Sequence, residues 1–214
     1  MRVGILGSGL MGGKLGTVLA RAGHEVVFSY ARSRDKLERL AREARGNARA
    51  GTPGEAVQRA DVLLLAVHWL RVGDVLKQAG DLSGKLIVSC SLPMNKDDSE
   101  LVIGGSSSGA EQLARALPGA RVVSAFNTVP SEVLFDVYAA RRRSRRPSVV
   151  YCGDDRRAKR VAAALIRDVG FDPVNAGPLR TARYTEPFAL LVARLAYEEK
   201  GGPRLAYRFE RFRD

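Results

Sequence analysis

Short apolar runs alternate along the chain with segments whose apolar residues recur at helical spacing. The first run is Val3–Leu6, and it ends in a glycine-rich turn. Leu15, Val18 and Leu19 then repeat every three or four positions, which is typical of one buried face of a helix. A second apolar run follows at Val26–Phe28. The first 30 or so residues therefore predict a strand, a turn, a helix and a second strand.

The same alternation continues through the rest of the chain. Asp61–Val67 is apolar after its first residue, which is typical of a strand covered on both faces. Thr52 precedes Pro53 and lies three residues before Glu55, a pattern that starts a helix. We expect further strands at 48–51, 85–89, 121–125, 148–152 and 171–174. We expect further helices at 34–44, 71–80, 106–117, 131–138, 155–168 and 181–200.

Strands that alternate with helices predict an α/β fold. We expect a doubly wound, mostly parallel sheet of the Rossmann type, with a small C-terminal helical portion. The predicted division is a nucleotide-binding domain over residues 1–180 and a helical extension over 181–214 that packs on it. In such sheets, ligands bind outside the carboxyl ends of the strands.

The turn after the first strand reads Gly-x-Gly-x-x-Gly. The first glycine permits a tight turn, the second lets a pyrophosphate approach the backbone, and the third lets the helix pack close to the sheet. Free N–H groups at the helix start then face the anion. We therefore expect a dinucleotide to be bound by Gly7, Ser8, Gly9, Leu10, Met11 and Gly12.

The end of the second strand indicates which dinucleotide is bound. A site for NAD usually has an acidic residue there, which binds the ribose 2′-hydroxyl. This chain has Ser29, Arg32 and Arg34 instead, and no acid before Asp35. Hydroxyl and guanidinium donors suit the 2′-phosphate of NADP(H). The alternative is that both arginines are solvated loop charges before the next helix.

Three further strand ends are expected to flank the nicotinamide. They contribute Val67 and His68, Ser89, and the segment from Ser124 to Pro130. His68, Asn127 and Thr128 are the candidate catalytic residues, although His68 could equally cap its strand. In the last helix, Tyr184, Glu186 and Phe188 either line the acceptor side or pack in the interior. Two histidines and two distant cysteines predict no metal site.

The chain is strongly basic, with a net charge of +12. Nucleic acid must therefore be considered as a partner. The densest basic run, Arg141–Arg146, has no interleaved aromatic residues, so we interpret it as a solvated loop rather than a nucleic-acid site. Positive charge also attracts polyanionic cofactors in general.

Other features of composition favour a soluble protein of the cytoplasm. No run approaches 18 uninterrupted apolar residues, and no signal peptide is visible. Cys90 and Cys152 each follow an apolar run and are predicted to be buried free thiols. A homodimer is possible, but no specific feature of the sequence indicates one.

Several segments together resemble one family of enzymes. The chain is similar to the NADPH-dependent reductases of coenzyme F-420, a deazaflavin, and to the related domain of membrane ferric reductases. Besides the glycine turn and the Ser/Arg segment, the resemblance rests on Val122–Pro130, Val150–Asp155, Asn175–Leu179, Arg183 and Glu186–Pro187. It implies a Rossmann domain that binds NADPH, with a flavin-like or F-420 second ligand. One position departs from the pattern: deazaflavin-binding enzymes have a histidine before Thr-Ile-Pro, where this chain has Asn127.

The sequence therefore predicts an NADP-dependent oxidoreductase that transfers hydride to a flavin-like or deazaflavin acceptor. Hydride transfer between planar cofactors needs alignment more than acid–base groups. Two alternatives remain open. One is reduction of a small carbonyl or imine substrate, although such enzymes usually carry a long second domain. The other is a non-catalytic NADPH-binding protein.

Overall fold

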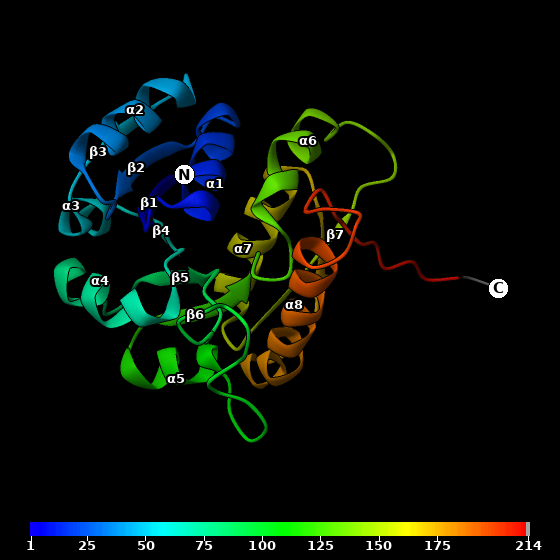
Figure 1. The fold of residues 1–214 in the computed structure, drawn as a ribbon. Helices are drawn as coiled ribbons and strands as arrows, with labels where there is room; N and C mark the ends of the chain where they lie inside the picture. Colours follow the sequence, from blue (N-terminus) through cyan, green and yellow to red (C-terminus); the bar gives the residue numbers. More distant parts are fainter. Residues whose placement is uncertain (213–214) are drawn as a thin grey trace.

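The protein is built on one eight-stranded sheet, described here from a computed structural model that covers residues 1–212. The strands are β1 (Arg2–Leu6), β2 (Glu25–Ser29), β3 (Ala48–Ala50), β4 (Val62–Leu65), β5 (Leu86–Ser89), β6 (Arg121–Ala125), β7 (Ser148–Gly153) and β8 (Asp172–Asn175). Their order across the sheet is β3-β2-β1-β4-β5-β6-β7-β8 (Figure 1). The order in which strands are added to the sheet therefore switches direction between β1 and β4, and such sheets bind ligands at this switch point.

Strands β1 to β6 are parallel to one another, and β7 runs antiparallel to β6. The last strand, β8, is again parallel to β7. The predicted doubly wound, mostly parallel sheet is thus confirmed. Because β7 is reversed, its first residue lies at the edge of the sheet where β1 to β6 end.

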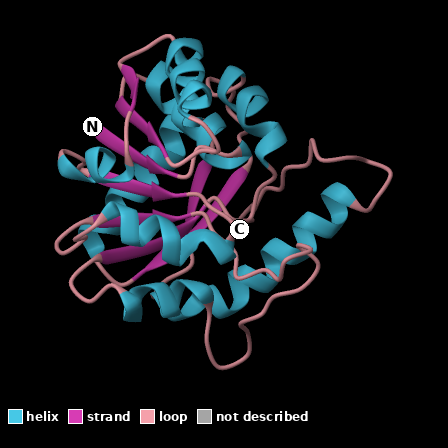
Figure 2. Ribbon diagram, turned by 60° about the vertical axis from the view of Figure 1, so that its left-hand side comes forward, coloured by secondary structure: helices cyan, strands magenta, loops and turns pink. Residues whose placement is uncertain are grey.

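The helices connect the strands and cover both faces of the sheet (Figure 2). They are α1 (Leu10–Arg21), α2 (Arg34–Ala44), α3 (Pro53–Gln58), α4 (Val72–Ala79), α5 (Gly109–Ala116), α6 (Leu134–Ala139), α7 (Arg156–Val169) and α8 (Ala182–Tyr197). Short 3-10 turns at 69–71, 131–133 and 179–181 lead into α4, α6 and α8.

Side-chain caps fix where several helices begin. Thr52 and Glu55 form the predicted capping box of α3. The expected helix at 106–117 begins later, at Gly109, because Ser108 is the capping residue: its hydroxyl accepts a hydrogen bond from the N–H of Glu111. A residue that caps a helix has extended backbone and cannot lie inside it.

Alternate residues of each strand feed two separate cores. Val3 and Ile5 of β1 pack with α1, α2, α6 and α7 on one face, and Leu6 packs with α3, α4 and α5 on the other. The strand pattern that is apolar on both faces explains this arrangement. Cys90 and Cys152 are buried free thiols, as predicted, and burial raises the pKa of each to about 12.

Helix α8 and the segment after it pack on the carboxyl half of the sheet. The buried face of α8 includes Thr185, Glu186, Ala189 and Val192, and it lies against α5. The division into domains at residue 180 stays a prediction, and residues 213–214 of the expected extension lie outside the described residues. Within residues 1–212, every helix is too short or too polar to cross a bilayer.

Candidate dinucleotide-binding site

The glycine turn has the geometry that a bound pyrophosphate requires. Gly7 has φ +113°, and a Cβ there would lie 2.4 Å from Cγ1 of Val67. A Cβ on Gly12 would lie 1.9 Å from the carbonyl oxygen of Gly7, so the helix start can approach the strand only without a side chain. A Cβ on Gly9 would meet no atom within 4 Å. Gly7 and Gly12 are thus required by the fold, whereas Gly9 leaves open space for a ligand.

The start of α1 is free to bind an anion. Gly9 caps the helix without a side-chain hydrogen bond, and its first turn contains no acidic residue. The first N–H groups of a helix have no partner inside it, and the helix dipole adds positive potential there. The side chain of Leu10 is exposed, and Met11 packs partly against the core. The backbone at Gly9 is therefore open to a ligand.

A large cavity of about 1520 Å³ lies in front of this turn. It extends from Gly7–Leu10 past the segment after β2 to Val67, His68 and Arg71. The carboxyl ends of β1, β2 and β4 thus form one continuous surface around it. Its extended shape and position at the switch in strand order suit a dinucleotide.

Basic side chains dominate the walls of this cavity. They are Arg32, Arg34, Lys36, Arg39, Arg42 and Arg71, against the two carboxylates of Asp35 and Asp74. Asp74 is itself engaged, since it accepts hydrogen bonds from the hydroxyl of Tyr30 and, at 3.1 Å, from Nε2 of Gln78. The bond from Tyr30 lowers the pKa of Asp74 the most. The remaining field is positive and favours phosphate groups.

Arg32 and Arg34 differ in their availability. Nε of Arg34 lies 3.0 Å from Oε1 of Glu38, one helical turn away. Within the described residues Arg32 forms no ion pair, and it also lines the cavity. Arg32 can therefore meet a phosphate without first leaving a carboxylate.

The hydroxyls of Ser8 and Ser29 are engaged within the fold. Ser8 Oγ donates to the carbonyl of Ser29 at 2.8 Å, and Ser29 Oγ donates to the carbonyl of Ile5 at 2.6 Å. Both side chains are fully buried. They join the ends of β1 and β2 and support the turn, and their placement offers no hydroxyl to a phosphate in the cavity.

Tyr30 is a cavity residue that the sequence reasoning missed. It follows β2 directly and has φ +57°, a left-handed conformation uncommon for a residue with a side chain. Its carbonyl accepts the N–H of Ser8 at 3.0 Å. This conformation turns the chain from β2 toward Arg32, so Tyr30 determines where the basic loop begins.

His68 lies at the cavity wall but is held by its own chain. Its Nδ1 accepts the N–H of Leu70 at 3.2 Å, so the ring proton lies on Nε2. Nε2 is 3.2 Å from the carbonyl oxygen of Asn95 and 3.0 Å from Oδ1 of Asp98. His68 therefore caps the 3-10 turn at 69–71 rather than its strand, and it also fastens the 95–98 loop to the end of β4.

The ends of β5 and β6 bring together Ser89, Ser124, Asn127 and Thr128. Ser89 pairs with Ser124 in register, and Nδ2 of Asn127 donates to Ser124 Oγ at 3.1 Å. All four side chains are buried, and the cavity wall described above reaches only as far as Val67 and His68. Thr128 Oγ1 lies 2.6 Å from the hydroxyl of Tyr207, far along the chain. Sequence reasoning missed Tyr207 because no local signal marks it.

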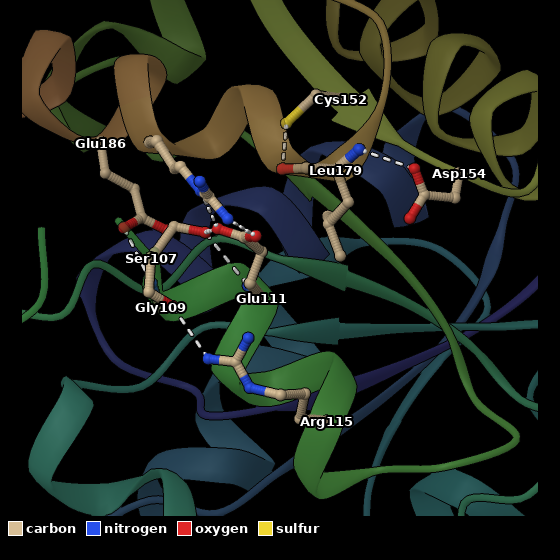
Figure 3. Close-up of polar contacts among 10 residues, drawn as sticks. Ser107, Gly109, Glu111, Arg115, Cys152, Asp154, Leu179 and Glu186 are labelled. Carbon is tan, nitrogen blue, oxygen red and sulfur yellow. Dashed lines mark hydrogen bonds and ion pairs between the residues drawn. The ribbon is translucent and has the colours of Figure 1, made fainter. Parts of the chain in front are cut away.

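Glu186 packs in the interior, the second of the two roles considered for it. Its oxygens accept the N–H groups of Gly109 and Ala110 at 2.9 and 3.0 Å, so α8 caps the start of α5 (Figure 3). Burial raises the pKa of this carboxyl, although the two hydrogen bonds oppose the shift. Phe188 packs edge-on against Tyr207, while Tyr184 is exposed. None of the three borders the dinucleotide cavity.

Metal-binding clusters are absent from residues 1–212, where no three His, Cys, Asp or Glu side chains converge. His24 is buried, and its Nε2 lies 3.1 Å from Oδ2 of Asp168. This contact joins β2 to the end of α7 and serves the fold.

Comparison with known proteins relates this site to one family. The sequence profile of the family described as "NADP oxidoreductase coenzyme F420-dependent" matches residues 2–93, which include the glycine turn, the Ser/Arg segment and the end of β4. Residues 2–93 are thus similar to the coenzyme F-420-dependent NADP oxidoreductases. The resemblance predicted from the sequence is confirmed, and the family is one of enzymes.

Individual relatives extend the likeness beyond residue 93. Metalloreductase STEAP3 of Rattus norvegicus is 33% identical over 189 residues, which are 88% of this chain but only 36% of the rat protein. The chain thus spans about a third of that relative. A solved structure from Arthrobacter sp., described as a candidate F420-dependent NADP reductase, has a TM-score of 0.85 and 24% identity, and the match covers 99% of this chain and 100% of that one.

A more distant likeness concerns the fold alone. A reductive aminase of Aspergillus terreus, solved with NADPH and ethyl levulinate, has a TM-score of 0.65 and 19% identity. The match covers 90% of this chain and 60% of the aminase. The shared part is therefore the Rossmann-like sheet with its helices.

Proposed function

We propose that this protein binds NADPH in the cavity at the ends of β1, β2 and β4 and transfers hydride to a flavin-like or deazaflavin acceptor. The observation that carries the proposal is the contrast within the glycine turn. Gly7 and Gly12 are closely packed, yet Gly9 faces open space beside the uncapped start of α1. A pyrophosphate fits that space and meets N–H donors there.

Discrimination for NADPH rests on the basic wall after β2. Arg32 is the unpaired cation nearest in sequence to the end of β2, and Arg34 and Lys36 follow on the same wall. An arginine can bind the 2′-phosphate with two parallel hydrogen bonds. Between the end of β2 and Asp35 there is no carboxylate to receive a ribose 2′-hydroxyl in the manner of an NAD site.

The mechanism assigned to the chain itself is one of binding and alignment. A bound nicotinamide cofactor supplies the hydride. The glycine turn and the basic wall hold the phosphates, while Val67 and His68 border the far end of the cavity. The buried segment from Ser124 to Thr128, which does not line that cavity, is assigned to the acceptor side beyond it, where exclusion of water protects a hydride donor.

The acceptor is proposed from the family and from the resemblance of the carboxyl half. Asn127 stands where deazaflavin-binding relatives have histidine, so a flavin, or a metal complex as the name of the rat relative suggests, competes with coenzyme F-420 as the acceptor. Reduction of a small imine or carbonyl is the second candidate. The fold shared with the reductive aminase favours it, and the match covers 60% of that enzyme.

The test is NADPH oxidation by purified protein, scanned against coenzyme F-420, FMN, FAD, ferric complexes and a panel of imines and carbonyls. We expect turnover with a flavin-like or deazaflavin acceptor and NADPH strongly preferred over NADH. Turnover with imines alone would replace the proposed acceptor. Tight NADPH binding without turnover on any of these compounds would leave only a dinucleotide-binding protein.

A further inference from the structure

The basic run Arg141–Arg146 is divided into anchored ends and an unanchored middle. Arg141 stacks on the ring of Tyr138 at 4.1 Å from the ring centroid, and Arg146 forms an ion pair with Asp172. Within residues 1–212, the three arginines between them, 142, 143 and 145, form no ion pair. The loop is therefore fixed at both ends and presents three free guanidinium groups.

These three arginines line a second cavity, of about 750 Å³. Its floor is apolar and consists of Val133, Val137, Ala139, Ala140, Pro147 and Ala206. The loop is exposed, as expected for a solvated loop, and its free cations also border this hollow. In Figure 1 the loop after α6 and the chain after α8 lie on the same side of the molecule.

Among residues 1–212, the one carboxylate on this cavity wall already has a partner. Asp136 accepts hydrogen bonds from Nε and Nη2 of Arg204 at 3.1 and 2.7 Å. This pairing leaves the three loop arginines with uncompensated charge over an apolar floor. Such a surface suits a molecule with one apolar part and one or more phosphate or carboxylate groups.

Two segments that line the second cavity are close in sequence to residues that meet after β6. Val133, on its wall, lies five residues after Thr128, and Ala206, also on its wall, precedes Tyr207. Tyr207 and Thr128 are joined by their hydroxyls at 2.6 Å. Both segments that contribute to the cavity therefore also meet at the wall assigned above to the acceptor side.

We propose that Arg142, Arg143 and Arg145 bind the anionic group of the acceptor, a small molecule that carries phosphate or carboxylate. This inference rests on the proposed function for the identity of the ligand, and on the cavity itself for the site. The dinucleotide is bound elsewhere, by the glycine turn and Arg32, so the two anionic ligands have separate sets of cations.

The experiment compares FMN with riboflavin, which lacks only the phosphate. Binding to the full chain is measured by equilibrium dialysis with NADP⁺ present, for wild type and for R142S/R143S/R145S. The matched control is R156S/R157S/R160S, which removes the same charge from exposed positions at the start of α7, beyond the opposite end of β7. Coenzyme F-420 and its core without phosphate and glutamates form a second pair of probes.

We expect wild type and the control to bind the phosphorylated probe at least about tenfold more tightly than its neutral counterpart, and the loop variant to lose that preference. Equal affinity of wild type for both members of each pair would overturn the proposal. So would an equal loss in the control, because the effect would then be one of net charge. If pyrophosphate binds the loop arginines as tightly as FMN does, the cavity is a site for a free anion instead.

Two further outcomes separate this site from the proposed function. If the arginines govern FMN binding but no flavin oxidises NADPH, the site stands and the redox function fails. If NADPH is oxidised equally by FMN and riboflavin in every variant, the function stands and the site fails. Loss of duplex DNA binding in the loop variant, with FMN binding unchanged, would assign the loop to nucleic acid and overturn the proposal.

Discussion

The two ends of the candidate site are encoded in different ways. The dinucleotide end comes from the first 78 residues, where a glycine turn, helix caps and strand ends follow one another in order. The proposed acceptor end depends on a contact between Thr128 and Tyr207, 79 residues further along the chain. A ligand recognised by backbone groups can be specified by a short contiguous motif, whereas a wall of buried side chains depends on distant packing.

The strongest test of this difference uses two glycines of the same turn. Gly9→Val should weaken NADPH binding by on the order of 100-fold while the melting temperature falls much less than in Gly12→Val, because a Cβ on Gly9 meets no atom of the fold. Gly12→Val should lower the free energy of unfolding by roughly 1–3 kcal/mol or more, because its side chain meets the backbone of Gly7. Calorimetry of binding and of unfolding measures both effects.

Equal destabilisation by the two substitutions would contradict this contrast. If Gly9→Val unfolds the protein as much as Gly12→Val does, Gly9 is a structural position and carries no information about a ligand.

The next test concerns the basic wall. Arg32→Ala should weaken NADPH binding by about 10- to 100-fold, the range for a charge-assisted hydrogen bond, and change NADH binding little. Arg59→Ala, an exposed position outside the cavity, serves as a control of equal charge. Dissociation constants for both cofactors check the prediction. An equal loss of affinity for NADPH and NADH would show that Arg32 does not bind the 2′-phosphate.

Much of the fold follows from patterns that act over a few residues. Apolar runs predicted the eight strands, and Thr52 with Glu55 predicted the start of α3 because capping is local. The antiparallel direction of β7 had no such signal, since strand direction depends on how a connection crosses the sheet. The start of α5 was predicted too early because neighbouring serines precede it and any of them could cap the helix. Only the extended backbone of Ser108 identifies it as the cap.

The site was predictable to the extent that backbone groups build it. The glycine turn and the arginines were visible in the sequence and line one cavity. Ser29 shows the limit: its position next to that cavity was foreseen, but the hydrogen bond that turns its hydroxyl toward Ile5 was not. Tyr207 was missed for the same reason, because its partner Thr128 is adjacent only in the folded chain.

A third test addresses the acceptor end. Tyr207→Phe removes the hydroxyl that bonds Thr128 and keeps the packing against Phe188. We expect a loss of about 1 kcal/mol in unfolding free energy, a lower turnover with the acceptor, and unchanged NADPH affinity. A change in NADPH affinity instead would mean that the two ends of the site are not independent. Denaturant titration and cofactor binding distinguish these results.

The smallest expected effects are opposite pH dependences at the junction of α5 and α8. Burial raises the pKa of Glu186 above its ordinary 4.5, so its contribution to stability is full below pH 4.5 and declines as the pH rises through the raised value. The hydrogen bond from Arg183 lowers the pKa of Glu111, so its contribution is present above pH 4.5 and declines as the pH falls through the lowered value.

Urea unfolding from pH 4 to 7 checks both signs. The stability lost in Glu186→Gln should shrink with rising pH, and the loss in Glu111→Gln should shrink with falling pH. Parallel curves for the two variants would show that neither carboxyl titrates with the assigned direction.

The hydroxyl contact between Thr128 and Tyr207 also has a consequence for biosynthesis. A ribosome completes the dinucleotide end after the first third of the chain, but it must reach residue 207 before the wall behind Thr128 can close. Folding proceeds from the amino terminus as the chain emerges. The nascent protein therefore contains every residue that lines the dinucleotide cavity well before it contains the hydroxyl that completes the wall behind Thr128.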